Sequence, residues 1–280
     1  MLIRSLHETV EHRPHRVDVL GALLLTGSLG LLLVGVLQGG VSWPWASWQS
    51  AVSFGLGGLL LVAFVAVERR ATEPILPGWV FSRRLLLTTT LVSVGVGAIL
   101  IGLASYVPVS LEGALGVSPL VAGLALAALT IGWPISAALS GRLYLTLGFR
   151  TTVLIGMVLV LAGTGLLAAF SATPSVGVSA IGCFITGLGL GLVATPSLIA
   201  AQASVEWNER GVVTGTNLFA RAVGQAVAVA IFGAVANTIY RAAGGGGVLG
   251  EGAGAVVDPV AIIPASQAVF IGALICAALT

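Results

Sequence analysis

Charged residues are absent from long stretches of this 280-residue sequence. The uncharged runs are 19–67, 85–111, 113–141, 151–205, 222–240 and 259–280. A helix rises about 1.5 Å per residue, so about 20 apolar residues cross the ~30 Å hydrocarbon layer of a bilayer. Most of the runs are at least that long. The sequence therefore predicts an all-α integral membrane protein.

The overall composition agrees with this class. Hydrophobic residues make up 57% of the chain and charged residues only 8%, whereas a soluble domain has about 25% charged residues. The formal net charge is only +2, and the basic residues are scattered along the sequence rather than clustered on one face. We therefore do not expect nucleic acid as a partner. His7, His12 and His15 match no zinc-ligand spacing. We expect no metal site and no cofactor.

Turn signals divide the uncharged runs into eight expected spans. The segment QGGVSWPWASWQS (38–50) has the Gly, Pro and Trp content of a turn at the membrane interface, and SATPSVG (171–177) breaks the longest run. The expected spans are 19–38, 50–67, 85–110, 117–141, 151–170, 177–201, 212–238 and a last one from Ser266 onward. Only 15 residues, 266–280, would form the last span, which is short, so we expect it to be truncated.

Arginine placement predicts the orientation, because positively charged loops stay cytoplasmic. One set of alternate loops contains ten arginines, and the other set contains only Arg241. The ten are Arg4, Arg13, Arg16, Arg69, Arg70, Arg83, Arg84, Arg142, Arg150 and Arg210. We therefore expect a multi-pass protein of the cell membrane with a cytoplasmic N-terminus.

Four segments, taken in order, resemble the fourteen-helix drug:proton antiporters of the EmrB/QacA type within the major facilitator superfamily. DVLGALLLTGSLGLLLVGVLQGG (18–40) resembles their seventh helix, and ERRATEPILPGWVFSRR (68–84) resembles the loop after the eighth. YVPVSLEGALGVSPLVAGLALAAL (106–129) resembles the hairpin of the ninth and tenth helices. GLGLGLVATPSLIAAQASVEWNERGVVTGTNLFARAVGQ (187–225) resembles the twelfth and thirteenth.

A fifth segment, GRLYLTLGFR (141–150), resembles a degenerate copy of the superfamily's cytoplasmic loop motif, Gly-x-x-x-Asp-Arg-x-Gly-Arg. Gly141, Gly148 and Arg150 are the residues that match. Leu145 and Thr146 stand where the motif has its Asp–Arg pair, so the charges of that pair are missing here.

The resemblance implies that the chain is the C-terminal part of a larger permease. It implies a cytoplasmic arm (1–18), two linker transmembrane helices (19–67), a cytoplasmic loop (68–84) and a C-terminal transporter domain (85–280) of six helices, the last one incomplete. The implied function is efflux of small hydrophobic or cationic molecules, including drugs, by proton antiport. Protons would bind in a missing N-terminal six-helix domain, and the chain alone would be inactive. The sequence agrees, because no expected span has a carboxylate at its centre.

One expected span carries polar side chains on a single face. Asn217, Arg221 and Gln225 recur every four residues, and Arg221 is roughly 15 Å along the helix from Gly211. An arginine at the centre of a span costs about 2.5–3.5 kcal/mol on insertion scales, so it normally faces a cavity or a partner. The stripe therefore lines a substrate cavity or a domain interface, or else Arg221 extends to the interface and binds carbonyls of the 202–210 loop.

Other residues offer weaker signals. Glu112 is either a cation-attracting group at the cavity mouth or a solvated loop charge, and Tyr106 and Trp133 either stack on an aromatic substrate or pack against helices. GLGLGL (187–192) lacks the strand-to-helix context of a nucleotide-binding loop. We expect Gly187 and Gly191 to form a small face for close helix packing.

Two other classes of function compete with this one. The chain is alternatively a stand-alone eight-helix protein that homodimerises into a carrier, with the lipid bilayer as its surroundings. A membrane enzyme is disfavoured, because the sequence shows no Ser–His–acid set, no H-E-x-x-H motif and no acidic pair within a span.

Overall fold

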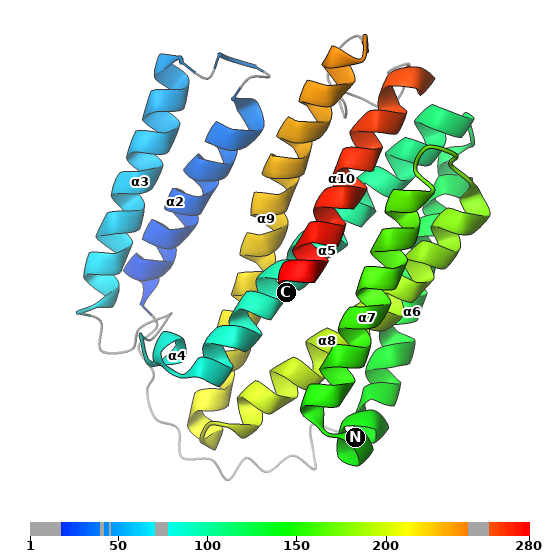
Figure 1. Cartoon of the computed structure of the whole chain (residues 1–280). Coiled ribbons are helices and arrows are strands. Elements are labelled where there is room, and N and C mark those ends of the chain that lie inside the picture. Colours follow the sequence, from blue (N-terminus) through cyan, green and yellow to red (C-terminus); the bar gives the residue numbers. More distant parts are fainter. Residues whose placement is uncertain (1–17, 40–41, 45, 71–77, 246–257) are drawn as a thin grey trace, which may run out of the picture.

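The computed structural model describes residues 18–39, 42–44, 46–70, 78–245 and 258–280 (Figure 1). Its elements are α2 (Val19–Gln38), α3 (Trp48–Glu68), α4 (Gly78–Ser82), α5 (Arg84–Leu115), α6 (Pro119–Leu147), α7 (Phe149–Ala169), α8 (Val176–Ala203), the 3-10 turn η1 (Trp207–Glu209), α9 (Arg210–Ala242) and α10 (Pro259–Leu279). Among these described elements, eight helices are long and apolar enough to cross a membrane. The prediction of an all-α membrane protein with eight spans is confirmed.

The last helix begins earlier than the sequence predicted. It starts at Pro259 rather than near Ser266, and it is 21 residues long. The Asp258 side chain caps its first turn by accepting a hydrogen bond of 2.9 Å from the Val260 backbone N–H. Proline is favoured at the first position of a helix because its missing N–H is not needed there. The expected start was therefore wrong, and with it the inference that only 15 residues form this span.

The helices pack as a six-helix bundle with a hairpin beside it. In the bundle α8 lies between α6 and α7, while α5 packs against α9 and α10. The helix α10 also contacts α7 and so joins the two groups. The hairpin of α2 and α3 stands at one edge, where α2 contacts α9 (Figure 1). An apolar groove of about 320 Å³ lies between α2 and α9.

The glycines of GLGLGL place α8 against two neighbours at once. A Cβ at Gly187 would collide with the backbone of Leu129 in α6, and one at Gly191 would collide with Ser136 of the same helix. A Cβ at Gly189 would lie 2.6 Å from the carbonyl oxygen of Gly156 in α7. Residues four apart share a helix face and residues two apart do not, so the alternating pattern serves opposite faces.

The backbones of α5 and α9 also touch directly. A Cβ at Gly97 in α5 would collide with the carbonyl oxygen of Arg221, and a Cβ at Gly224 in α9 would collide with that of Val94. Small residues permit such close approach, and in a bilayer van der Waals packing replaces the hydrophobic force between helices. This contact fixes the depth of Arg221 in the bundle.

The arginines of the described loops gather at one end of the bundle. Arg69 and Arg70 follow α3, Arg83 and Arg84 begin α5, and the remaining ones, Arg142, Arg150 and Arg210, lie at the α6–α7 and α8–α9 junctions (Figure 1). Arg241 lies at the far end of α9. The alternation that the loops showed in sequence is therefore also a spatial separation in the described residues.

We predict that Gly224→Ala destabilises the bundle by about 1–3 kcal/mol, the usual cost of overpacking. The new methyl group would force α9 away from Val94. The matched control is Gly215→Ala on the same helix, where nothing lies within 4 Å of a new Cβ. That control is expected to gain about 0.5–1 kcal/mol, because Ala favours helix over Gly. Thermal unfolding of the purified protein in detergent measures both, and equal midpoints for the two variants would contradict the packing argument.

Candidate functional site

Asn217 links α9 to α5 in the interior of the bundle. Its side chain is 2% exposed. The Ser93 hydroxyl donates a hydrogen bond to Asn217 Oδ1, and Asn217 Nδ2 donates one of 3.3 Å to the carbonyl oxygen of Thr89. Both ends of the amide are thus satisfied by α5. Asn217 therefore holds two helices together at this depth rather than facing an open cavity.

Arg221 points away from α5 and toward α6. Its Cζ atom lies 5.5 Å from the ring centroid of Trp133. Trp133 is fourteen residues from either end of α6, so the guanidinium stays at mid-depth. The alternative in which Arg221 extends to the 202–210 loop is not the arrangement in the structure. The backbone contact at Gly97 explains this direction, because no side chain fits between α5 and α9 there.

The cation–π contact leaves Arg221 only partly compensated. Such a contact contributes about 0.5–2 kcal/mol, whereas an arginine in mid-membrane costs about 2.5–3.5 kcal/mol. The Nε atom is buried and has no hydrogen-bond partner among the described residues. No carboxylate of the described residues lies within 4.0 Å of the guanidinium. The site is therefore one positive charge with unused donors.

Two more polar side chains lie on α9, one turn before Asn217 and one turn beyond Arg221. Thr214, one turn before Asn217, accepts a hydrogen bond of 2.7 Å from Gln202 Nε2 and so ties α9 to the end of α8. Gln225, one turn beyond Arg221, is half-buried and makes no hydrogen bond to another described side chain. Of the predicted stripe, Arg221 and Gln225 thus have side chains free for a further partner.

The structure does not bring Tyr106 and Glu112 into this site. They lie nine and fifteen residues beyond Gly97 on α5, which is roughly 14 and 22 Å along the helix. Tyr106 packs among apolar side chains between two parts of the core. Glu112 is half-buried in the last turn of α5. Tyr106 and Glu112 are therefore separated from the other predicted cavity residues, which lie near the middle of the bundle. Both lie nearer to the end of the bundle opposite the arginine-rich end.

The residues of the loop motif form the junction of α6 and α7. Gly148 separates the two helices and has a φ of 84°, a conformation that only glycine adopts without strain. The rings of Tyr144 and Phe149 stack across the junction with centroids 4.7 Å apart. Gly141 lies within α6, and Arg150 is exposed in the first turn of α7. Of the three motif residues, Gly148 and Arg150 therefore belong to the tight turn and Gly141 precedes it.

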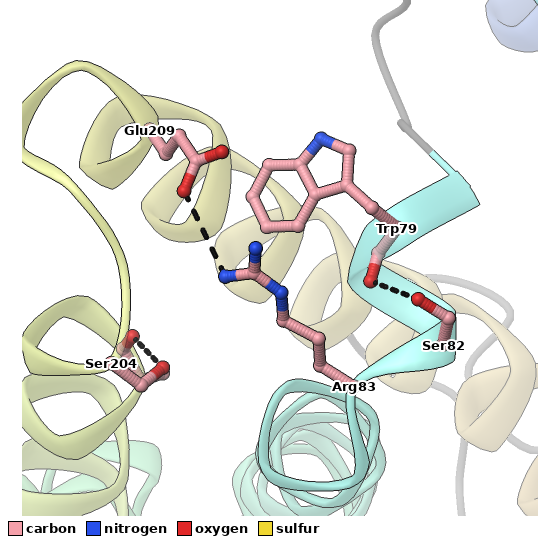
Figure 2. Close-up of polar contacts among 6 residues, drawn as sticks. Trp79, Ser82, Arg83, Ser204 and Glu209 are labelled. Atoms are coloured by element: carbon pink, nitrogen blue, oxygen red, sulfur yellow. Dashed lines mark hydrogen bonds and ion pairs between the residues drawn. The ribbon is translucent and has the colours of Figure 1, made fainter.

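Sequence reasoning missed a polar contact at the arginine-rich end. Figure 2 shows Arg83 between Trp79 of α4 and Glu209 of η1. The guanidinium lies 3.8 Å from the Glu209 carboxylate and 5.1 Å from the ring centroid of Trp79. Exposed pairs of this kind contribute about 0–1 kcal/mol. The i, i+4 spacing of Trp79 and Arg83 was the available signal, but their partner lies far along the chain.

Beneath that contact a separate apolar cluster docks α4 onto the α8–α9 junction. Its buried members are Val80, Leu86, Ala201, Val205 and Val213. The first residues of α5 and of α9 are thus joined by apolar packing as well as by the ion pair. The described residues contain no group of three His, Cys, Asp or Glu side chains that could hold a metal ion.

Comparison with known proteins identifies similar chains. A family model described as Major Facilitator Superfamily matches residues 5–229. The chain is 30% identical to the multidrug transporter protein MdtP of Bacillus subtilis (strain 168) over 236 residues, which are 84% of this chain and 44% of the relative. It is also 30% identical to multidrug resistance protein 3 of the same organism, over 85% of this chain and 47% of the relative.

A third relative is the tetracycline resistance determinant of Streptomyces rimosus, which is 30% identical over 77% of this chain and 62% of its own length. The chain thus spans about half the length of the two Bacillus relatives. Their names describe what those proteins do as whole molecules.

We predict that Asn217 and Ser93 are energetically coupled. The single changes Asn217→Ala and Ser93→Ala and the double change form a cycle whose coupling energy is expected near 0.6 kcal/mol, the average for hydrogen bonds between membrane helices. Unfolding of each purified variant in detergent gives the free energies from which this coupling energy is calculated. The control cycle pairs Asn217→Ala with Ser140→Ala, because the Ser140 hydroxyl bonds within its own helix. Additive effects in both cycles would show that the Ser93–Asn217 bond stabilises nothing.

Proposed function

The chain belongs to the major facilitator superfamily, and from this premise we propose that it is part of a multidrug efflux permease. The bundle of α5–α10 supplies one wall of the substrate cavity. The observation that carries this is Arg221, held at mid-depth against Trp133 with donors that no described residue uses. A charge kept in a membrane interior is by default functional. The names of the relatives, multidrug transporters and resistance proteins, support the same function.

The other wall is an N-terminal six-helix domain of the same permease. The chain matches less than half of each Bacillus relative, which leaves room for such a domain in the whole molecule. The hairpin of α2 and α3 serves as the pair of linker helices in a fourteen-helix architecture of the EmrB/QacA type. Its position at the edge of the bundle supports this role, because the main contact of α2 with the six helices is with α9 in the described residues.

Transport is driven by proton antiport, and the proton-binding carboxylates belong to the other half. The described carboxylates support this division, because each lies at a helix end or in a loop. They are Asp18, Glu68, Glu112, Glu206, Glu209 and Asp258. None is placed to exchange a proton at mid-depth beside Arg221. The chain by itself is therefore inactive.

The function is tested by export in cells that lack other drug pumps. Three proteins are compared: the chain alone, the first half of the Bacillus subtilis multidrug transporter MdtP alone, and that half joined to this chain. Only the joined protein is expected to lower drug accumulation. The Arg221→Gln variant of the joined protein tests whether export depends on this residue of the cavity wall. Drug export by the chain alone, together with a native mass of two copies, would instead support a homodimeric carrier.

We predict that the arginine-rich end faces the cytoplasm of the cell, with the N-terminus on the same side. Thr146 and Thr173 are exposed at opposite ends of the bundle, in the last turn of α6 and the α7–α8 turn. In a background with Cys183 and Cys276 replaced by Ala, a membrane-impermeant maleimide is expected to label Thr173→Cys in intact cells. Thr146→Cys is expected to react only after permeabilisation. The reverse pattern would invert the orientation.

A further inference from the structure

The central site around Arg221 is positively charged. Arg221 is the one charged side chain at mid-depth among the described spans, and its neighbours Trp133, Asn217 and Gln225 are uncharged. Glu112, the acidic residue that the sequence placed in the predicted cavity, is roughly 22 Å away along α5 from the level of Gly97. A cationic group entering beside Arg221 would be repelled in a medium of low dielectric constant, and nothing described there offsets this.

The geometry of the contact leaves the hydrogen-bond donors of Arg221 available. The Cζ atom of Arg221 lies over the face of the Trp133 ring, 5.5 Å from its centroid, and a ring face is a much weaker hydrogen-bond acceptor than an oxyanion. No described residue accepts a hydrogen bond from the Arg221 side chain. The buried Nε–H is without a partner among described residues, and a planar oxyanion group such as a carboxylate accepts two guanidinium N–H groups at once.

We propose that Arg221 and Trp133 form a subsite for the anionic group of an aromatic, amphipathic substrate. The oxyanion binds the in-plane donors of Arg221, and the aromatic part lies along the indole of Trp133. The half-buried Gln225 amide, one turn further along α9, is within the same wall. This inference rests on the proposed efflux function. It assigns hydrophobic anions to this wall, in place of the hydrophobic or cationic molecules expected from the sequence.

The test uses two dyes with one scaffold. The 280-residue chain is placed in phosphatidylcholine nanodiscs, so that no anionic lipid competes. It is titrated with 8-anilinonaphthalene-1-sulfonate, an anion, and with N-phenyl-1-naphthylamine, its neutral counterpart. Binding is followed by energy transfer from tryptophan, with empty nanodiscs and direct dye fluorescence as backgrounds. The variants are Arg221→Gln, Trp133→Phe, which keeps an aromatic ring, and Arg241→Gln, an exposed arginine at the far end of the same helix.

The expected result is selective. Arg221→Gln weakens binding of the sulfonate about tenfold, the usual size of a lost charge-assisted hydrogen bond, and leaves the neutral dye within about twofold. Arg241→Gln changes neither dye. Trp133→Phe keeps most of the sulfonate affinity when that affinity is read from direct dye fluorescence. Circular dichroism and the unfolding midpoint confirm that each variant is folded.

The results that overturn the proposal also separate it from the proposed function. Equal losses for both dyes in Arg221→Gln, or equal losses in Arg241→Gln, remove the anion subsite but leave a substrate-binding wall. Absence of saturable binding of either dye removes the wall itself. In the joined permease, loss of export of an aromatic acid and of its methyl ester alike in Arg221→Gln would show that Arg221 pairs with the other half instead.

Discussion

Direct contact between helix backbones is the constraint on which this bundle depends. Lipid tails are as apolar as the side chains, so helices associate through close packing and a few hydrogen bonds. At α5 and α9 that contact is made by Gly97 and Gly224, and the Ser93–Asn217 bond lies one to two turns away. The same contact leaves Arg221 no space toward α5. Packing in the bundle thus decides where Arg221, the one central charge among the described residues, points.

The fold was largely readable from the sequence because a bilayer admits few solutions. A span must satisfy its own backbone hydrogen bonds, so uncharged runs of sufficient length become helices and turns fall at Gly, Pro and Trp clusters. The start of α10 was missed because Asp258 and Pro259 look like loop residues in isolation, although together they cap a helix. The short α4 was missed because five residues carry no reliable periodicity.

The site was readable only in part. Helical spacing found Asn217 and Arg221 on one helix, since that spacing is a property of one segment. Their partners Ser93 and Trp133 lie on other helices, and no local pattern states which helices meet. Grouping Tyr106 and Glu112 with them ignored distance along α5, which the helical rise alone would have shown.

The Arg221 side chain also connects two groups of helices, which contact each other at other positions as well. The helices α5, α9 and α10 contact one another, and so do α6 and α7 with α8. At mid-depth, α9 reaches α6 through the Arg221 side chain over Trp133. A long side chain accommodates changes in separation that a glycine contact does not tolerate, so the α6–α9 contact is more adaptable than the α5–α9 contact.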